Sequence, residues 1–133
     1  MSYTICYMSK TNPDLTEKEI QEIFEQTSKN NNSAGIRGIL LHGLGNFFQV
    51  LEGDKEVIVP LYSEKIMNDS RHTEVFEIMN RTTQMAVFSN YNSNFNIVKT
   101  NQQLEDIKKY CGRHMLESTT SHKLYRLLQP FII

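Results

Sequence analysis

A glutamine within an apolar run is the first residue whose chemistry needs an explanation. Gln49 follows Phe47 and Phe48 and precedes Val50 and Leu51, and this flanking pattern predicts that it is buried. A buried carboxamide has two donors and an acceptor, and each needs a hydrogen-bond partner. Because side chains alternate along a strand, Gln49 is expected on the same face as Phe47 and Leu51, where a neighbouring strand must supply that partner.

A tyrosine on the first predicted strand is the candidate partner. Residues 3–8 are rich in aromatic and β-branched side chains and stop before a turn signal at 12–14, so they are predicted to form a strand with Ile5 and Tyr7 on one face. If this strand lies beside that of Gln49, a phenol and a carboxamide meet inside the domain. The pattern alone favours a simpler alternative, in which Gln49 bonds a backbone group and Tyr7 is a core tyrosine.

Two further groups of polar residues are candidates for ligand contacts. Asn30 and Asn31 end a predicted helix, where asparagine is common as a cap, and only closeness to Gln49 in the fold would give them another role. Arg71, in the charged turn 69–72, could hold a phosphate, although such turns are also frequent on surfaces. The sequence has no Cys-His pair, glycine-rich phosphate loop or metal-binding spacing, so no metal site is predicted.

The elements that position these residues are predicted in the order strand, helix, strand, strand, helix, strand, strand, followed by a helical tail. This βαββαββ order describes an α+β, ferredoxin-like sandwich. We expect the two long helices on one face of the sheet, with a flat ligand between them, and the tail helices on the other face. The expected ranges are strand 3–8, helix 16–30, a hairpin of strands 36–42 and 46–51, a helix from 54 with a bend at Pro60, strands 74–82 and 91–98, and a helical tail over 102–128 interrupted near Gly112.

Length and charge limit the classes of function. A chain of 133 residues is sized for one domain. Its formal net charge of -1, from 14 basic and 15 acidic residues that are interspersed, gives neither a basic stripe for nucleic acid nor a polybasic membrane patch. Cys6 and Cys111 are far apart and the N-terminal segment has no long apolar stretch. A cytoplasmic location is therefore expected, with neither nucleic acid nor membrane as a partner.

Five sequence segments, taken together, resemble the BLUF family, which are sensors of blue light that use flavin. They occur in the family's order and cover about residues 3–97. The element F-x-Q-x-L-E-G followed by D-x-R-H is specific in combination. The matching segments are 6–9 (CYMS), 30–31 (NN), 36–41 (IRGILL), 45–53 (GNFFQVLEG) and 69–72 (DSRH).

The resemblance implies a noncovalently bound flavin, with FAD as the first choice and FMN as the alternative. The side chain of Asn31 would hydrogen-bond the polar edge of the ring, with Asn30 beside it. Ile23 and Ile66, on the two long helices, would sandwich the faces of the ring.

The resemblance also implies a photochemical role for Tyr7 and Gln49. Excited flavin would take an electron from Tyr7 and a proton through Gln49, and recombination would leave Gln49 with a rearranged hydrogen-bond pattern. The light signal is then stored in hydrogen bonding with no net chemistry, so no enzymatic activity is expected. Arg71 and His72 would lie near the ribityl-phosphate end, where a cation can pair with phosphate.

Two departures from the family pattern bear on this mechanism. Tyr91 and Ser93 stand where the family usually has tryptophan and methionine, so they are expected to relay the signal, with Ser93 bonding Gln49 in one light state. The second helix is one residue longer over 62–69 than is usual, which affects the match of Ile66.

The expected function is that of a short light receptor that signals through protein contacts. Residues 1–98 would form the flavin-binding domain, and residues 99–133 a helical extension that packs on the sheet. Light would change the packing of this tail, or a homo-oligomer that it supports, and an unidentified protein partner would receive the signal. A flavin-free, ferredoxin-like interaction module is the alternative, and a flavin redox enzyme is less favoured because the sequence has no nicotinamide signature.

Overall fold

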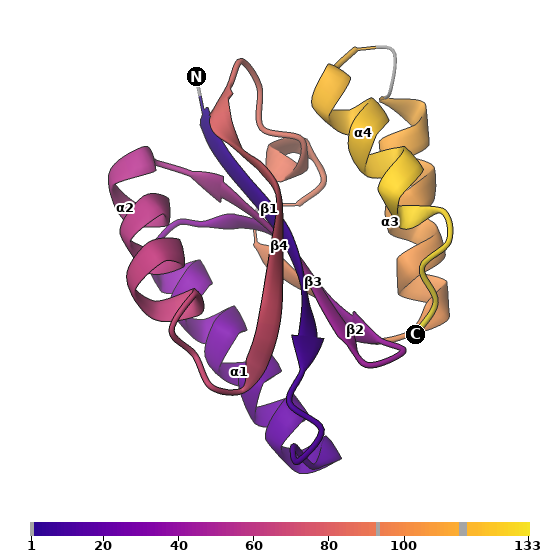
Figure 1. Ribbon diagram of the computed structural model, residues 1–133. Helices are drawn as coiled ribbons and strands as arrows, with labels where there is room; N and C mark the ends of the chain where they lie inside the picture. The colour runs from indigo at the N-terminus through magenta and orange to yellow at the C-terminus, as the bar shows by residue number, and fades with distance from the viewer. Residues whose placement is uncertain (1, 93, 115–116) are drawn as a thin grey trace.

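The computed structural model describes residues 2–92, 94–114 and 117–133. Its sheet has five strands in the order β4-β1-β3-β2-β5, all antiparallel except β5, which pairs with β2 in parallel. The expected ferredoxin-like α+β sandwich is confirmed (Figure 1). The elements are β1 (Ser2–Thr11), α1 (Glu17–Ser33), β2 (Arg37–Gly43), β3 (Asn46–Gly53), α2 (Lys55–Pro60), the π-helix η1 (Leu61–Ile66), β4 (His72–Thr83), the 3₁₀ turn η2 (Phe88–Asn90), β5 (Phe95–Val98), α3 (Asn101–Arg113) and α4 (Thr119–Leu128).

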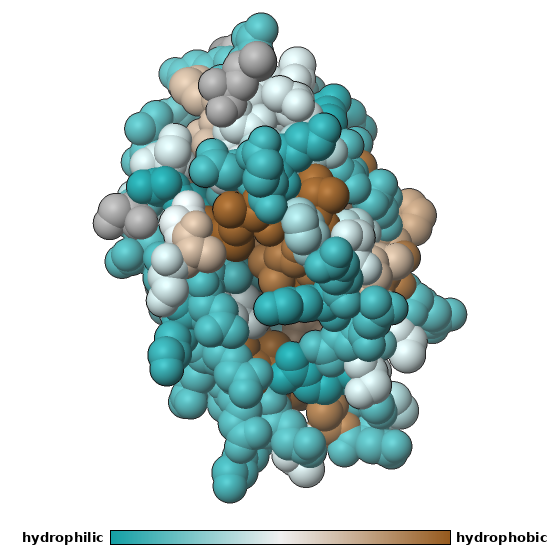
Figure 2. Space-filling view, turned by 90° about the vertical axis from the view of Figure 1, so that its left-hand side faces the viewer, coloured by the Kyte–Doolittle hydropathy of each residue, from teal (hydrophilic) through white to brown (hydrophobic). Residues whose placement is uncertain are grey.

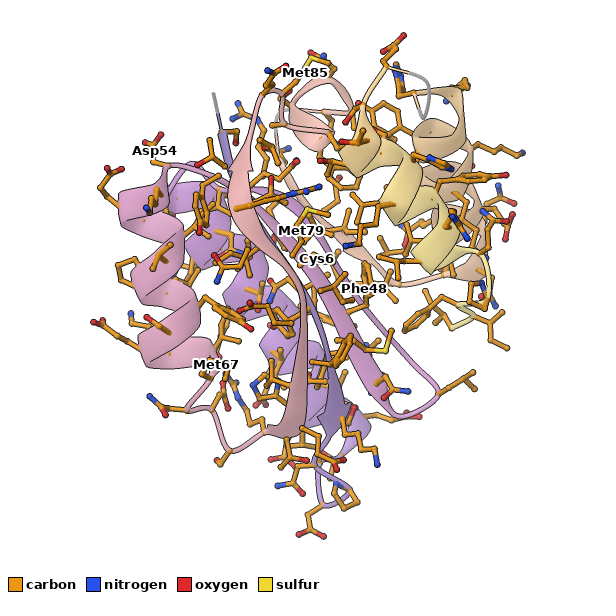
Figure 3. All side chains as sticks on the ribbon, turned by 45° about the horizontal axis from the view of Figure 1, so that its top comes forward. Cys6, Phe48, Asp54, Met67, Met79 and Met85 are labelled. Atoms are coloured by element: carbon orange, nitrogen blue, oxygen red, sulfur yellow. The ribbon has the colours of Figure 1, made fainter. Side chains whose placement is uncertain are left out.

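The sheet separates two apolar cores. On one face, α1 and the continuous segment of α2 and η1 cover Ile5, Leu40 and Leu51. On the other face, α3 and α4 cover Cys6, Phe48 and Met79, which lie toward these two helices in Figure 3. This division follows from strand alternation, because neighbouring residues of β1 and β3 point to opposite faces. No helix within the described residues has both the length and the apolar character needed to cross a membrane.

Helix α1 begins as predicted and ends one turn later than predicted. Thr16 and Glu19 form a complete capping box, in which each side chain bonds the backbone N–H of the other residue. The helix continues to Ser33, so Asn31 lies within it and not at its end. The termination comes instead at Gly35, whose φ of +72° is available to glycine at little cost.

The expected irregularity near Pro60 is present and takes a specific form. Pro60 ends the α-helical segment α2, and residues Leu61–Ile66 continue as the π-helix η1. A single π-turn is how a helix accommodates one extra residue without losing its direction. The π-helix is compatible with the extra residue expected over 62–69, and its last residue, Ile66, packs against the core beneath the helix.

In the second half of the chain the expected start of the last strand is wrong, and the expected interruption of the helical tail near Gly112 is confirmed, since α3 ends at Arg113. The last strand begins at Phe95 and not at residue 91, because the Asn92 side chain accepts a hydrogen bond from the Asn94 N–H (2.8 Å) and forms a turn there. Helix α3 runs through Gly112 to Arg113. A Cβ at Gly112 would come within 2.8 Å of the Tyr125 ring, so this glycine allows α4 to pack closely on α3.

Candidate functional site

A cleft opens between α1 and η1 over the sheet face that carries Tyr7 and Gln49. Figure 2 shows this side of the molecule, with an apolar hollow surrounded by polar surface. The cleft volume is about 180 Å³. Its lining residues are Tyr7, Ile23, Gln26, Thr27, Asn30, Asn31, Leu40, Phe47, Gln49, Leu61, Lys65, Ile66, Asp69, Arg71 and His72. The eight residues expected around a ligand, Tyr7, Ile23, Asn30, Asn31, Gln49, Ile66, Arg71 and His72, are therefore all brought together here.

Tyr7 and Gln49 face each other on adjacent strands. They are direct partners in the antiparallel register of β1 and β3, and the Gln49 Nε2 donates to the Tyr7 Oη at 2.5 Å. Both side chains are 4% exposed. Burial raises the pKa of the Tyr7 phenol above its usual range, although the bond from Gln49 opposes this shift. The phenol therefore keeps its hydrogen at neutral pH and can donate it.

Two buried polar atoms at the cleft have no hydrogen-bond partner among the described residues. They are the Gln49 Oε1, an acceptor, and the Asn31 Nδ2, a donor. Leaving such atoms unpaired costs free energy, so a pair of them on one cleft indicates a ligand that supplies a donor and an acceptor. The polar edge of a flavin ring offers both kinds of group, and these residues therefore fit that cofactor.

The cleft walls are apolar where the faces of a planar ring would lie. Ile23 projects from α1, and Ile66 and Leu61 project from η1. Leu40 and Phe47 belong to the same core as these side chains. The arrangement accommodates a flat aromatic group whose two faces meet aliphatic side chains and whose edge meets amides.

Arg71 lines the cleft but is already paired. Its Nε and one terminal nitrogen donate to the two carboxylate oxygens of Asp69 at 2.9 and 2.6 Å, and its other terminal nitrogen donates to Gln26 Oε1 at 3.1 Å. This bidentate pair lowers the pKa of Asp69. Within the described residues Lys65 has no ion-pair partner. Unlike Arg71, this cleft-lining cation is therefore available to pair with a negatively charged group of a ligand.

His72 also has both ring nitrogens occupied by the protein. Nδ1 lies 2.7 Å from the Ser9 hydroxyl and Nε2 lies 2.6 Å from the carbonyl oxygen of Ile66. The expected contact of His72 with a phosphate would break one of these bonds. His72 at the cleft thus connects Ser9 to the Ile66 carbonyl, and this structural role explains its position better than a charge available to a phosphate does.

Tyr91, the first of the two residues expected to relay the signal, is not among the described residues that line the cleft. Tyr91 packs on Tyr110 of α3, with ring centroids 4.8 Å apart, on the sheet face opposite Gln49. Ser93 lies outside the described residues, so its expected bond to Gln49 stays a prediction. The described part of the chain contains no cluster of His, Cys, Asp or Glu that could hold a metal ion.

Sequence reasoning missed four polar residues of the cleft: Gln26, Thr27, Lys65 and Asp69. Gln26 and Thr27 follow Ile23 at helical spacing on α1, and Lys65 precedes Ile66, so helix periodicity could have indicated them. Asp69 was noted only as part of a charged turn. Its partner Arg71 is two residues away, and the pairing depends on the local turn geometry.

A buried carboxylate connects the site strand to the other face of the sheet. Glu52 on β3 is 1% exposed, and it accepts the backbone N–H groups of Val87 (2.7 Å) and Phe88 (2.8 Å) at the start of η2. Burial raises the pKa of Glu52 to about 7, and the two backbone bonds counteract that shift. The Tyr110 hydroxyl of α3 donates to the Val87 carbonyl at 2.5 Å. Three elements therefore meet at Val87.

Fold and site together define a domain that binds a planar heteroaromatic cofactor between two helices on a ferredoxin-like sheet. The family model described as "Sensors of blue-light using FAD" (BLUF) matches residues 2–94. The chain belongs to the BLUF family, whose domain is a flavin-based sensor of blue light and is not itself catalytic.

Individual relatives agree with this assignment. The chain is 33% identical over 85 residues to photoactivated adenylate cyclase subunit beta of Euglena gracilis, which covers 64% of this chain and 10% of that protein. Among solved structures, the photo-activated state of BlsA gives a TM-score of 0.70 at 25% identity over 100% of this chain and 99% of that one. BlrP1 of Klebsiella pneumoniae gives 0.69 at 33% identity over 83% and 28%, and one of its structures contains FMN. This chain thus spans about a tenth of the curated cyclase.

Proposed function

We propose that this chain is a blue-light receptor in which Tyr7 and Gln49 convert light into a changed hydrogen-bond pattern around a bound flavin. The observation that carries the proposal is the Gln49 side chain. It donates to Tyr7 through one end, and its other end is a buried acceptor without a partner at the cleft. Such an amide can reverse its orientation and thereby exchange a donor for an acceptor toward the ligand.

Different residues of the cleft would contact different parts of the flavin ring. The Asn31 Nδ2 would donate to the polar edge of the flavin, and Ile23 and Ile66 would hold its faces. A bound flavin supplies the absorption of blue light and an excited state that accepts an electron. Tyr7 is the donor placed for this step, because its protonated phenol is held directly against Gln49. The Nε2 that faces Tyr7 can only donate, so Gln49 would accept the phenolic proton through its oxygen after the amide turns, and it would keep that other orientation once the proton has returned to Tyr7.

The cleft volume supports binding of the ring and not of a whole dinucleotide. About 180 Å³ is below the 300–1,000 Å³ typical of sites that enclose an entire small ligand. We infer FAD as the natural cofactor. FMN could also bind, because the adenosine half of FAD would lie outside the cleft and would not be needed to hold the ring. Lys65 is the cation available for the phosphate end, and Arg71 would shape the loop through Asp69 and Gln26.

The decisive experiment is a light-minus-dark spectrum of the purified protein. We expect a yellow protein whose absorbance shifts to the red in blue light. Heat or acid should release the flavin intact, because the contacts proposed at the cleft are all noncovalent. Chromatography of the released flavin identifies FAD or FMN. A colourless protein after expression with excess riboflavin, or flavin that stays attached on denaturation, would contradict the proposal.

We infer that the signal leaves through residues 99–133, the helical extension outside the family match. The chain of contacts from β3 through Glu52 and Val87 to Tyr110 supports this route, since it joins the strand of Gln49 to α3 by hydrogen bonds. Three apolar side chains of this tail, Leu124, Leu128 and Phe131, are buried in the core on this face of the sheet. Light would therefore change how the tail packs on the sheet or on a second copy of the chain.

Tyr110→Phe is expected to weaken this output without affecting the photochemistry. The variant removes one oxygen, and with it the bond to the Val87 carbonyl, on the sheet face opposite Gln49. Hydrogen exchange in dark and light should show a light-dependent change in α3 and α4 that is about fivefold smaller, the factor that corresponds to losing a hydrogen bond worth about 1 kcal/mol. Tyr125→Phe on α4 is the control. An equal effect of both variants, or no light effect in the wild type, would exclude this route.

The partner and the location of the protein are also proposals. We infer an unidentified protein partner or a homo-oligomer as the receiver, because a change in the packing of the tail would expose apolar side chains that are now buried against the sheet. A cytoplasmic location is supported by Cys6 and Cys111, which are both buried free thiols and not a disulfide.

A further inference from the structure

Buried Ser9 and half-buried His72 form a hydrogen-bonded pair at the cleft that has no part in the photochemical steps above. Ser9 lies on β1 two residues after Tyr7 and is 2% exposed. Its hydroxyl lies 2.7 Å from Nδ1 of His72, and Nε2 of the same ring lies 2.6 Å from the carbonyl oxygen of Ile66. His72 therefore connects the strand of Tyr7 to the last residue of η1.

The two contacts determine which ring nitrogen carries the hydrogen. A backbone carbonyl can only accept, so Nε2 must donate to Ile66. In the neutral ring Nδ1 is then the acceptor, and the Ser9 hydroxyl donates to it. The carbonyl of Ile66 stands at a helix end, where carbonyls lack helical partners, and its other bond is from the Asp69 N–H at 3.2 Å. The imidazole thus donates a hydrogen bond to a carbonyl oxygen that has no partner within the helix η1.

Two aromatic side chains, Tyr7 and Phe47, also pack against the His72 ring and restrict its orientation. The ring meets Tyr7 edge to face, with centroids 6.0 Å apart and planes at 66°, and meets Phe47 at 6.4 Å and 79°. Both aromatic neighbours line the cleft, as does Ile66. A rotation of the imidazole would consequently disturb the phenol that bonds Gln49 and the side chain that faces the ligand.

We propose that Ser9 and His72 are positioning residues for the photochemical reaction of this domain. Ser9 fixes the orientation of the His72 ring, whose tautomer the Ile66 carbonyl sets, and His72 in turn holds the Ile66 end of η1 over the cleft and the Tyr7 ring against Gln49. This inference rests on the proposed function, because it assigns the pair to the reaction of Tyr7 and Gln49. It also removes His72 from the groups available to a phosphate.

The test compares Ser9→Ala with Thr11→Val in the flavin-loaded protein. Thr11 makes the same kind of hydroxyl–imidazole contact on the same strand, to His42 Nε2 at 2.8 Å, but neither of these residues lines the cleft. In Ser9→Ala the His72 ring loses the donor that fixes it, so the barrier to the return of Gln49 should fall. We expect dark recovery about five- to tenfold faster, the factor that one ordinary hydrogen bond represents, and a change below about twofold in Thr11→Val.

Nitrogen NMR of the His72 ring supplies a readout that recovery kinetics alone do not. The wild type should show the Nε2–H tautomer, and in Ser9→Ala the Nδ1 resonance should shift because that nitrogen loses its hydrogen-bond donor, while the protein keeps its flavin. Equal recovery rates in the two variants, or an Nδ1–H tautomer in the wild type, would overturn the positioning role and leave the receptor function intact. A wild type that binds flavin but shows no photoproduct would refute the proposed function and the positioning role together.

Discussion

Gln49→Leu is expected to abolish the light-induced red shift while the protein remains yellow. Leucine has a similar size, but it can neither donate to the Tyr7 hydroxyl nor present a donor or acceptor to the cleft. The stored signal is a change in the bonding of this one amide, so its loss should leave no photoproduct. Flavin affinity should fall by less than about tenfold, because only one hydrogen bond to the ligand is lost.

The measurement is a light-minus-dark spectrum together with a flavin titration of the apoprotein. Gln21→Leu, an exposed position of α1 that does not line the cleft, controls for the substitution itself. A normal red shift in Gln49→Leu would place the switch in another side chain. Loss of all bound flavin would instead show that Gln49 is mainly a binding residue.

Tyr7→Phe is expected to remove the usual photoproduct with an equally large effect and with the domain still folded. Only the phenolic oxygen is lost from a ring that is packed between Tyr62 and His72. Without that oxygen the excited flavin has neither the electron donor nor the proton donor that Gln49 contacts. Transient absorption and the steady-state difference spectrum both report the loss.

Tyr62→Phe is the matched control, because its ring centroid lies 5.7 Å from that of Tyr7 in the same core. It should retain the photoproduct. The Tyr7→Phe, Tyr91→Phe double variant should behave as Tyr7→Phe alone, since Tyr91 packs against α3 on the opposite face of the sheet. An unchanged difference spectrum in Tyr7→Phe would rule out Tyr7 as the donor, and a residual photoproduct in Tyr7→Phe that the double variant lacks would show that Tyr91 is a second donor.

The sequence by itself determined the elements and the two central residues. Strand alternation predicts which neighbours share a face with Tyr7 and with Gln49, and the family resemblance assigned these two residues to the flavin site. The capping box at Thr16 likewise fixes the start of α1 through residues three apart. These features depend on the local spacing of residue types, so they can be recognised without knowing the fold.

The partners of the polar side chains were decided only by the tertiary structure. Arg71 carries the charge expected at a phosphate, yet the geometry of the turn pairs this guanidinium with the Asp69 carboxylate. His72 contacts Ser9, which lies 63 residues away in the chain on another strand. Tyr91 could have faced either side of the sheet until the contact with α3 placed it. A hydrogen bond requires two groups within about 3 Å and in line. Residue types along the chain predict which groups need partners, and only the packing of distant segments determines which partners they find.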